Sequence, residues 1–88
     1  ILVSGQSVLR VFPNPTRDNI TVDIRLKENE NADIVITNAL GQIVFSKTDY
    51  MPISEQPLSI DTRLFSPGVY LLRLITSSEE RTIKLIKE

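Results

Sequence analysis

Apolar and polar residues alternate with a period of two along most of this chain of 88 residues. The segment ITVDIRL, Ile20 to Leu26, shows the pattern clearly, because each apolar residue in it is followed by a polar or charged one. Successive side chains of a β-strand point to opposite faces, so this pattern predicts a strand with one buried and one exposed face. A chain built in this way must bury the apolar faces of its strands against a second layer.

Seven apolar segments of this kind are separated by residues that form turns or carry charge. They are Val8–Phe12, Ile20–Leu26, Ala32–Thr37, Ile43–Lys47, Leu58–Asp61, Val69–Thr76 and Thr82–Lys87. Short strands at spacings of about 8–12 residues are typical of antiparallel sandwiches. The sequence therefore predicts an all-β, seven-stranded antiparallel β-sandwich. The last segment is preceded by residues able to cap a helix, but its alternation and its β-branched residues favour a strand.

The length of the chain allows one domain. We interpret residues 1–7 as the end of an upstream linker and residues 8–88 as the domain itself. The first residue is Ile1 and not methionine, so we expect the sequence to be a part of a longer chain.

Two prolines bracket one asparagine in the stretch FPNPT, Phe12 to Thr16. Pro13 and Pro15 lack a backbone N–H group, so no ladder of hydrogen bonds can run through them. Asn14 precedes a proline and is therefore biased away from the helical conformation. This stretch is expected to end one strand and to lead into the next.

The segment VYLLRLI, Val69 to Ile75, is apolar on both of its faces apart from Arg73. Such a strand is expected at the centre of a sheet with both faces covered. Pro67 and Gly68 directly before it predict a tight turn, since glycine enters conformations with positive φ at little cost.

The composition argues against several classes of function. The net charge is −1, whereas nucleic-acid-binding domains of this size usually carry a basic excess. The chain contains no cysteine and no histidine, which excludes disulfides and thiolate or imidazole metal sites. No apolar run approaches the ~20 residues of a membrane-spanning helix. Histidine, the usual proton carrier, is missing, and a sandwich of this size has little room for a cleft between two carboxylates. We therefore predict no catalytic residue, no metal site and no cofactor.

A carbohydrate-binding module and a spacer domain with an immunoglobulin-like or fibronectin-like fold are the alternatives that remain open. Sugar-binding modules usually display flat aromatic rings, often tryptophan, and this chain has no tryptophan. Tyr50 and Met51 lie in an expected loop and are the candidates for an exposed binding surface. The other aromatic residues lie in or beside apolar segments, which predicts that they belong to the core: Phe12, Phe45, Phe65 and Tyr70.

Basic residues close the chain on its last predicted strand. Arg81, Lys84 and Lys87 fit two interpretations. Charged side chains on an edge strand discourage pairing with another chain. Alternatively, the edge of this strand docks onto a receptor by strand addition, with the basic side chains setting the orientation.

Four motifs follow one another in a defined order along the chain. They are FPNPT, then NALGQIV (Asn38–Val44), then LFSPGVYLLRL (Leu64–Leu74) and finally KLIK (Lys84–Lys87). In this order and spacing they resemble the C-terminal sorting domain of cargo proteins of the type IX (Por) secretion system. The resemblance runs from about Val11 to Glu88, which is nearly the whole chain.

The resemblance implies an immunoglobulin-like sandwich at the end of a protein secreted by a Gram-negative bacterium. In that family the cargo crosses the inner membrane with a signal peptide, and the sorting domain is recognised in the periplasm. The partners implied are the outer-membrane translocon, shuttle proteins and the N-terminal cargo domains, without nucleic acid and without direct membrane insertion. A sortase-like peptidase then commonly removes the domain, and the cargo is anchored at the cell surface or released. The domain would be an address and a substrate, not an enzyme.

The family motifs assign recognition residues to particular positions of this sequence. They are Pro13, Asn14, Pro15 and Thr16 in the first block, Gly41 and Gln42 in the second, Gly68, Val69, Tyr70 and Arg73 in the third, and Lys84 and Lys87 in the last. Glu88 follows the final lysine at a point where many relatives end, which is a small departure from the family pattern.

Overall fold

The structure, a computed structural model, describes residues 8–26, 30–51, 56–77 and 79–88 of the chain. Within these ranges it contains seven strands and no helix. The strands are β1 (Val8–Phe12), β2 (Asn19–Arg25), β3 (Ala32–Thr37), β4 (Ile43–Tyr50), β5 (Leu58–Asp61), β6 (Gly68–Ile75) and β7 (Glu80–Lys87). None of the described residues belongs to a helix long and apolar enough to span a membrane. The interpretation of residues 1–7 as a linker falls outside the described part of the chain.

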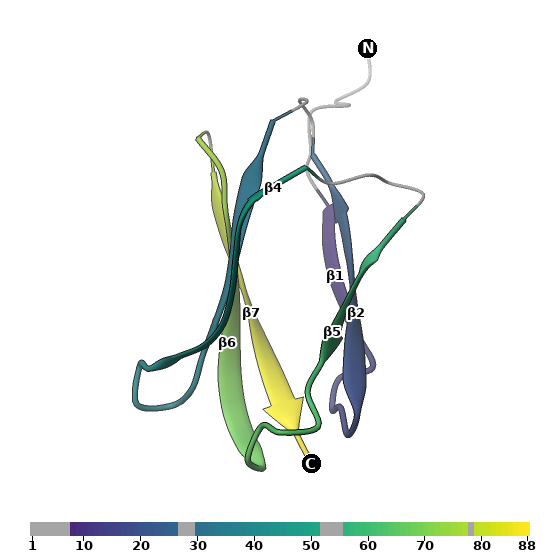
Figure 1. The fold of residues 1–88 in the computed structure, drawn as a ribbon, viewed down its shortest axis with the longest axis vertical. Coiled ribbons are helices and arrows are strands. Elements are labelled where there is room, and N and C mark those ends of the chain that lie inside the picture. Colours follow the sequence, from purple (N-terminus) through teal and green to yellow (C-terminus); the bar gives the residue numbers. More distant parts are fainter. Residues whose placement is uncertain (1–7, 27–29, 52–55, 78) are drawn as a thin grey trace.

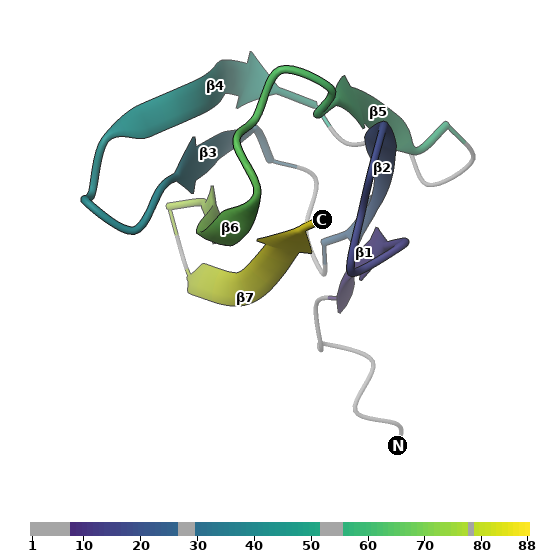
Figure 2. The same ribbon diagram turned by 90° about the horizontal axis from the view of Figure 1, so that it is seen from below.

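The strands form two sheets that face each other (Figures 1 and 2). One sheet has the order β1-β2-β5 and the other the order β4-β3-β6-β7, and all neighbouring strands are antiparallel. The predicted all-β, seven-stranded antiparallel sandwich is therefore confirmed. The largest difference from the predicted strands is at the end of β4, which continues past Lys47 to Tyr50. The segment after residue 79 is a strand, as its alternation predicts.

Residues of six of the seven strands, including Leu9 of β1, form the buried core between the two sheets. Their side chains point inward because every second residue of a strand faces the same side. Burial of each such aliphatic side chain stabilises the fold by about 1.5–3 kcal/mol. The buried residues include Ile20, Val22 and Ile24 of β2, Ile34 and Ile36 of β3, Ile60 of β5, Leu72 and Leu74 of β6, and Leu85 of β7.

Strand β6 lies inside its sheet, between β3 and β7, but only one of its faces is covered. Tyr70, Leu72 and Leu74 are buried, whereas Val69 and Leu71 on the opposite face are each 43% exposed. The prediction that both faces are covered is therefore wrong, because the fold has two layers and the outer face of this sheet meets no third one.

Two aromatic residues also differ from expectation. Phe12, predicted to be in the core, is 45% exposed at the end of β1, with the guanidinium of Arg10 5.8 Å from its ring centroid. Tyr50, predicted to lie in an exposed loop, ends β4 and packs partly buried against the core, with Lys47 over its ring. An exposed tyrosine platform for sugars is therefore not present at Tyr50.

Tyr70 fixes the connection that carries the chain from one sheet to the other. Its hydroxyl donates a hydrogen bond of 2.6 Å to the carbonyl of Ser66, four residues upstream. The ring of Phe65 packs beside it, with 5.1 Å between the two ring centroids. A tyrosine that bonds back to the preceding backbone at this corner is a recurrent feature of immunoglobulin-like sandwiches.

Replacement of Tyr70 by phenylalanine is expected to lower the free energy of unfolding by about 1–2 kcal/mol, because the Ser66 carbonyl loses its partner. Equilibrium unfolding in urea measures the change. Tyr50→Phe is the matched control, since no hydrogen bond involves the Tyr50 hydroxyl within the described residues, and its effect should be small. Equal effects of the two substitutions would contradict a specific role for the Tyr70 hydroxyl.

Candidate recognition surface

The turn between β1 and β2 lies beside the C-terminal end of β7, about 70 residues later in the sequence (Figure 1). The backbone N–H of Thr16 donates to the carbonyl of Ile86 at 2.8 Å, and the Thr16 carbonyl accepts from the N–H of Glu88 at 2.8 Å. Thr16 and Lys87 thus form a short parallel bridge. Through this bridge the three-stranded sheet is joined to the edge of the four-stranded sheet.

The side chain of Asn14 extends the same pairing toward the middle of β7. Its amide Nδ2 donates to the carbonyl of Lys84 at 2.8 Å, and its Oδ1 accepts from the N–H of Ile86 at 3.0 Å. Pro13 and Pro15 have no N–H group to offer, so the asparagine side chain takes the place of a paired backbone. We call the turn Pro13–Thr16 together with Lys84–Glu88 the clasp.

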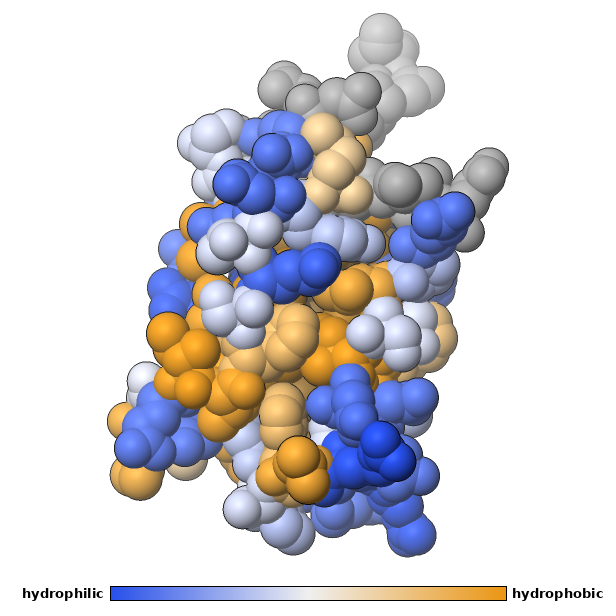
Figure 3. Space-filling model, in the orientation of Figure 1, coloured by the Kyte–Doolittle hydropathy of each residue, from blue (hydrophilic) through white to orange (hydrophobic). Residues whose placement is uncertain are grey.

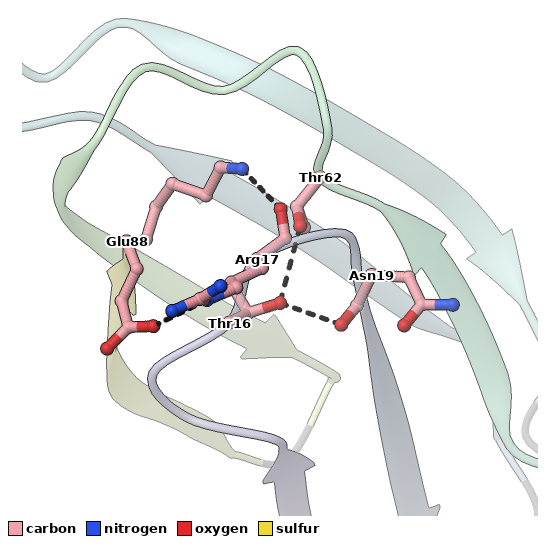
Figure 4. A network of polar contacts seen from close by, with 6 residues as sticks. Thr16, Arg17, Asn19, Thr62 and Glu88 are labelled. Atoms are coloured by element: carbon pink, nitrogen blue, oxygen red, sulfur yellow. Dashed lines mark hydrogen bonds and ion pairs between the residues drawn. The ribbon is translucent and has the colours of Figure 1, made fainter.

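Thr16 is a fully buried residue of the clasp (Figure 4). Its hydroxyl donates to the carbonyl of Asn19 at 2.7 Å and lies 3.4 Å from the hydroxyl of Thr62, which is also fully buried. The N–H of Thr62 donates in turn to the carbonyl of Asp18 at 2.9 Å. Both buried hydroxyls are therefore satisfied, and the turn is anchored to the end of β5 as well as to β7.

Lys87 points inward and not toward a docking partner. It is only 8% exposed, and its Nζ donates to the carbonyl of Arg17. Arg17 in turn forms an exposed ion pair of 3.1 Å with Glu88. The prediction that the basic side chains of this strand are displayed outward is thus wrong for Lys87, while Lys84 is exposed.

The second family block forms the hairpin between β3 and β4. Gly41 has φ of +85°, a conformation that glycine adopts readily. The side chain of Asn38 holds the turn, because its Oδ1 accepts from the N–H groups of Leu40 and Gln42 and its Nδ2 donates to the Gln42 side chain. Asn38 is a positioning residue that the sequence analysis did not single out, although asparagine at the start of a turn is a recognisable pattern.

The third block contributes to a groove of 760 Å³ between this hairpin and the connection from β5 to β6. Gly68, Val69 and Tyr70 line it, together with residues of the hairpin. Gly68 has φ of +151°, again a conformation that favours glycine. We call this the end groove; its large apolar lining residues include Leu40, Val44, Phe45, Leu64, Phe65 and Val69.

The clasp and the end groove lie toward the same end of the sandwich, where β7 ends, with the β3–β4 hairpin on one side of this end and the β1–β2 turn on the other (Figures 1 and 2). Arg73 is not part of this end. It lies farther along β6, opposite Thr82, and forms an ion pair of 2.6 Å with Glu80. The structure therefore brings parts of the first and last family blocks together in the clasp, and parts of the second and third together at the end groove. It leaves Arg73 outside both, with Lys84 at the inner limit of the clasp.

Asp61 and Arg63 form a charged pair on the rim of the end groove. Two side-chain nitrogens and the backbone N–H of Arg63 donate to the Asp61 carboxylate at 2.9–3.3 Å. The side-chain hydrogen bonds, followed by the backbone hydrogen bond, lower the pKa of Asp61 from 3.8 to about 2. The carboxylate is therefore ionised, and already paired, throughout the neutral range.

Substitution of Asn14 by alanine is expected to lower the free energy of unfolding by about 1–2 kcal/mol, since it removes two hydrogen bonds to β7. Urea unfolding of the variant measures this change. Asn19→Ala is the control, because the side-chain amide of Asn19 points away from the network in Figure 4. A loss of stability no larger in N14A than in N19A would show that the side chain of Asn14 does not hold the clasp.

A carbon-13 NMR titration of the side-chain carboxyl groups is expected to give Asp61 a pKa of about 2. Since this pKa is lowered by folding, the carboxylate adds stability above pH 3.8, and the contribution is lost as the pH falls toward 2. Arg63→Gln is expected to return the pKa toward 3.8, whereas Arg17→Gln leaves it unchanged. An unchanged pKa in R63Q would contradict the assignment of its cause.

Comparisons with known proteins agree with this geometry. A model of the family described as the secretion system C-terminal sorting domain matches residues 10–88. No curated protein sequence matches the chain. Among solved structures, the chain is similar to a part of PorZ, described as an essential surface component of the type IX secretion system of Porphyromonas gingivalis. The TM-score is 0.65 at 15% sequence identity, and the match covers 91% of this chain but 11% of the PorZ chain.

The similarity to PorZ concerns the fold alone, whereas the family match runs from the middle of β1 through all the other strands. Such a domain interacts with the secretion system and directs export to the cell surface or the extracellular space of Gram-negative Bacteroidetes. The chain therefore belongs to the family of C-terminal sorting domains that address proteins to the type IX secretion system.

Proposed function

We propose that the domain is a non-catalytic address that outer-membrane translocon and shuttle proteins of the type IX system read during transit through the periplasm. A sortase-like peptidase then usually separates it from the N-terminal cargo domains. The family match supports this reading, together with the four motifs that the chain shares with type IX sorting domains.

One observation supports the proposal: family segments far apart in the sequence lie together in two pairs, the first with the last in the clasp and the second with the third at the end groove. Val8 lies at the other end of β1, where it pairs with Arg25, while Phe12 leads into the clasp. The chain thus continues toward residues 1–7 from a point remote from the clasp and the end groove. A cargo attached on that side leaves the recognition surface free for the secretion machinery.

The contacts of β7 limit the ways in which a receptor can bind this strand. Strand addition along Lys84–Lys87 requires free backbone groups on the outer edge of the strand. The carbonyls of Lys84 and Ile86 and the N–H groups of Ile86 and Glu88 are already bonded to the turn. The second edge strand of this sheet, β4, has register shifts at two points in its pairing with β3, a feature that discourages regular strand addition. We therefore propose that the secretion machinery binds the surface at the end of the sandwich that carries the clasp and the end groove, and that it does not add a strand to β7 or β4.

A reporter protein fused in front of the full chain tests the proposal in a Gram-negative host with a working type IX system. The reporter is expected at the cell surface or in the medium, and its exported form should lack the sorting domain. In a host without the system, the fusion should remain in the periplasm with the domain attached. Retention of the fusion in the competent host would contradict the address function, and an exported form that keeps the domain would contradict the peptidase step.

A deletion of Lys84–Glu88 is a poor test, although it removes the last family block. Leu85 and Lys87 are buried, so their loss destabilises the sandwich itself. Point substitutions of exposed residues separate recognition from folding.

A further inference from the structure

The end groove is lined by the two most exposed large apolar residues of the described chain. Leu64 is 97% exposed on the β5–β6 connection and Leu40 is 82% exposed on the hairpin. Val44 and Val69, at 38% and 43%, continue the apolar surface between them. Figure 3, in the orientation of Figure 1, shows hydrophobic residues gathered over the middle and the lower left of this face of the molecule. Clustered apolar exposure of this kind marks interaction sites, whereas single exposed apolar residues do not.

Hydrogen bonds within the domain hold the walls of the end groove in place. Asn38 fixes the hairpin that carries Leu40, through three hydrogen bonds to Leu40 and Gln42. Phe65, next to Leu64, donates its N–H to the carbonyl of Thr62 at 3.0 Å. The bond from Tyr70 to Ser66 secures the far side of the same connection. A site shaped in advance loses less conformational freedom when a partner binds.

Three cations at this end of the sandwich are engaged within the domain, whereas Lys84, at the inner limit of the clasp, is exposed. Arg63 is paired with Asp61 at 2.9 Å, and Arg17 with Glu88 at 3.1 Å. The ammonium group of Lys87 is bound to the carbonyl of Arg17 and is buried. Because these three charges are compensated and Lys84 does not line the end groove, the groove offers a partner mainly apolar side chains.

We propose that the end groove binds an uncharged apolar segment of a type IX machinery component, whose aliphatic or aromatic side chains enter between Leu40 and Leu64. The inference rests on the proposed function, since it names the chemistry by which the address is read. The volume of 760 Å³ accommodates several side chains and lies within the range of sites that bury most of a ligand. Recognition is thus hydrophobic, and the exposed ion pairs at this end do not contribute to it.

Four variants of the same reporter fusion test the inference in the competent host. Leu64→Ser and Leu40→Ser are each expected to reduce export by about tenfold or more, the scale set by burial of one leucine side chain. Met51→Ser is the matched control, because Met51 is 47% exposed but does not line the groove. Arg17→Gln opens the ion pair with Glu88. Export of both M51S and R17Q is expected to remain within about twofold of the unsubstituted fusion, since neither change removes apolar surface from the groove.

Folding is monitored separately, by urea unfolding of each purified variant. Leu64 and Leu40 are so exposed that their replacement by serine is expected to change stability by less than about 0.5 kcal/mol. A loss of export without a loss of stability therefore reports recognition.

The possible results separate the two proposals. If the unsubstituted fusion is not exported, the address function itself fails. If it is exported and L64S and L40S are exported equally well, the end groove is not the recognition site. A defect in R17Q as large as that in L64S would show ionic recognition and overturn the apolar assignment. Sedimentation of the purified chain gives the remaining outcome: self-association abolished by L64S would identify a second copy as the occupant and also overturn the proposal.

Discussion

The pairing of Thr16 with the end of β7 is the contact on which the shape of this domain depends. A two-layer sandwich of seven short strands has its sheets joined chiefly by side-chain packing, and its edges are exposed. Here the turn Pro13–Thr16 crosses from the sheet of β1 to the edge of β7 and bonds to its backbone. The side chain of Asn14 adds two further bonds, and the buried hydroxyl of Thr16 ties the turn to β2 and β5. The first and last family motifs thus act as one structural unit.

This unit explains why an asparagine between two prolines suits the position. The prolines end the ladder between β1 and β2, so the chain can leave one sheet and reach the other. Because prolines lack a backbone N–H group, the residues on either side of Asn14 cannot donate to β7. The side chain of Asn14 supplies both a donor and an acceptor to that strand. As a result, the backbone groups on the outer edge of the terminal half of β7 are already bonded and are not available for addition of another strand.

The strands could be predicted from the sequence because alternation depends only on local geometry. It marks which residues share a face, and the buried apolar residues of β2 are those that the pattern indicates. Asp23, on the polar face of the same strand, is buried as well and pairs with Arg10, which the alternation does not indicate. Alternation does not tell whether a second sheet or solvent covers an apolar face, and the exposed face of β6 was missed for that reason. Lys87 is a different case. It lies two residues after Leu85 on the same face of β7, so the alternation predicts that it is buried, whereas its charge predicts that it is exposed. The clasp depends on contacts between residues about 70 positions apart, which no local pattern reveals.

The contact between the turn and β7 can be tested directly by native-state hydrogen exchange of single backbone amides. The amides of Ile86 and Glu88 are bonded to the turn, whereas Thr82 faces the same side of β7 beyond its reach. The account predicts exchange at Ile86 and Glu88 slower than at Thr82 by on the order of 100-fold, and faster exchange at Ile86 in N14A. Equal exchange rates at the three amides would show that the clasp does not close the edge of β7 in solution.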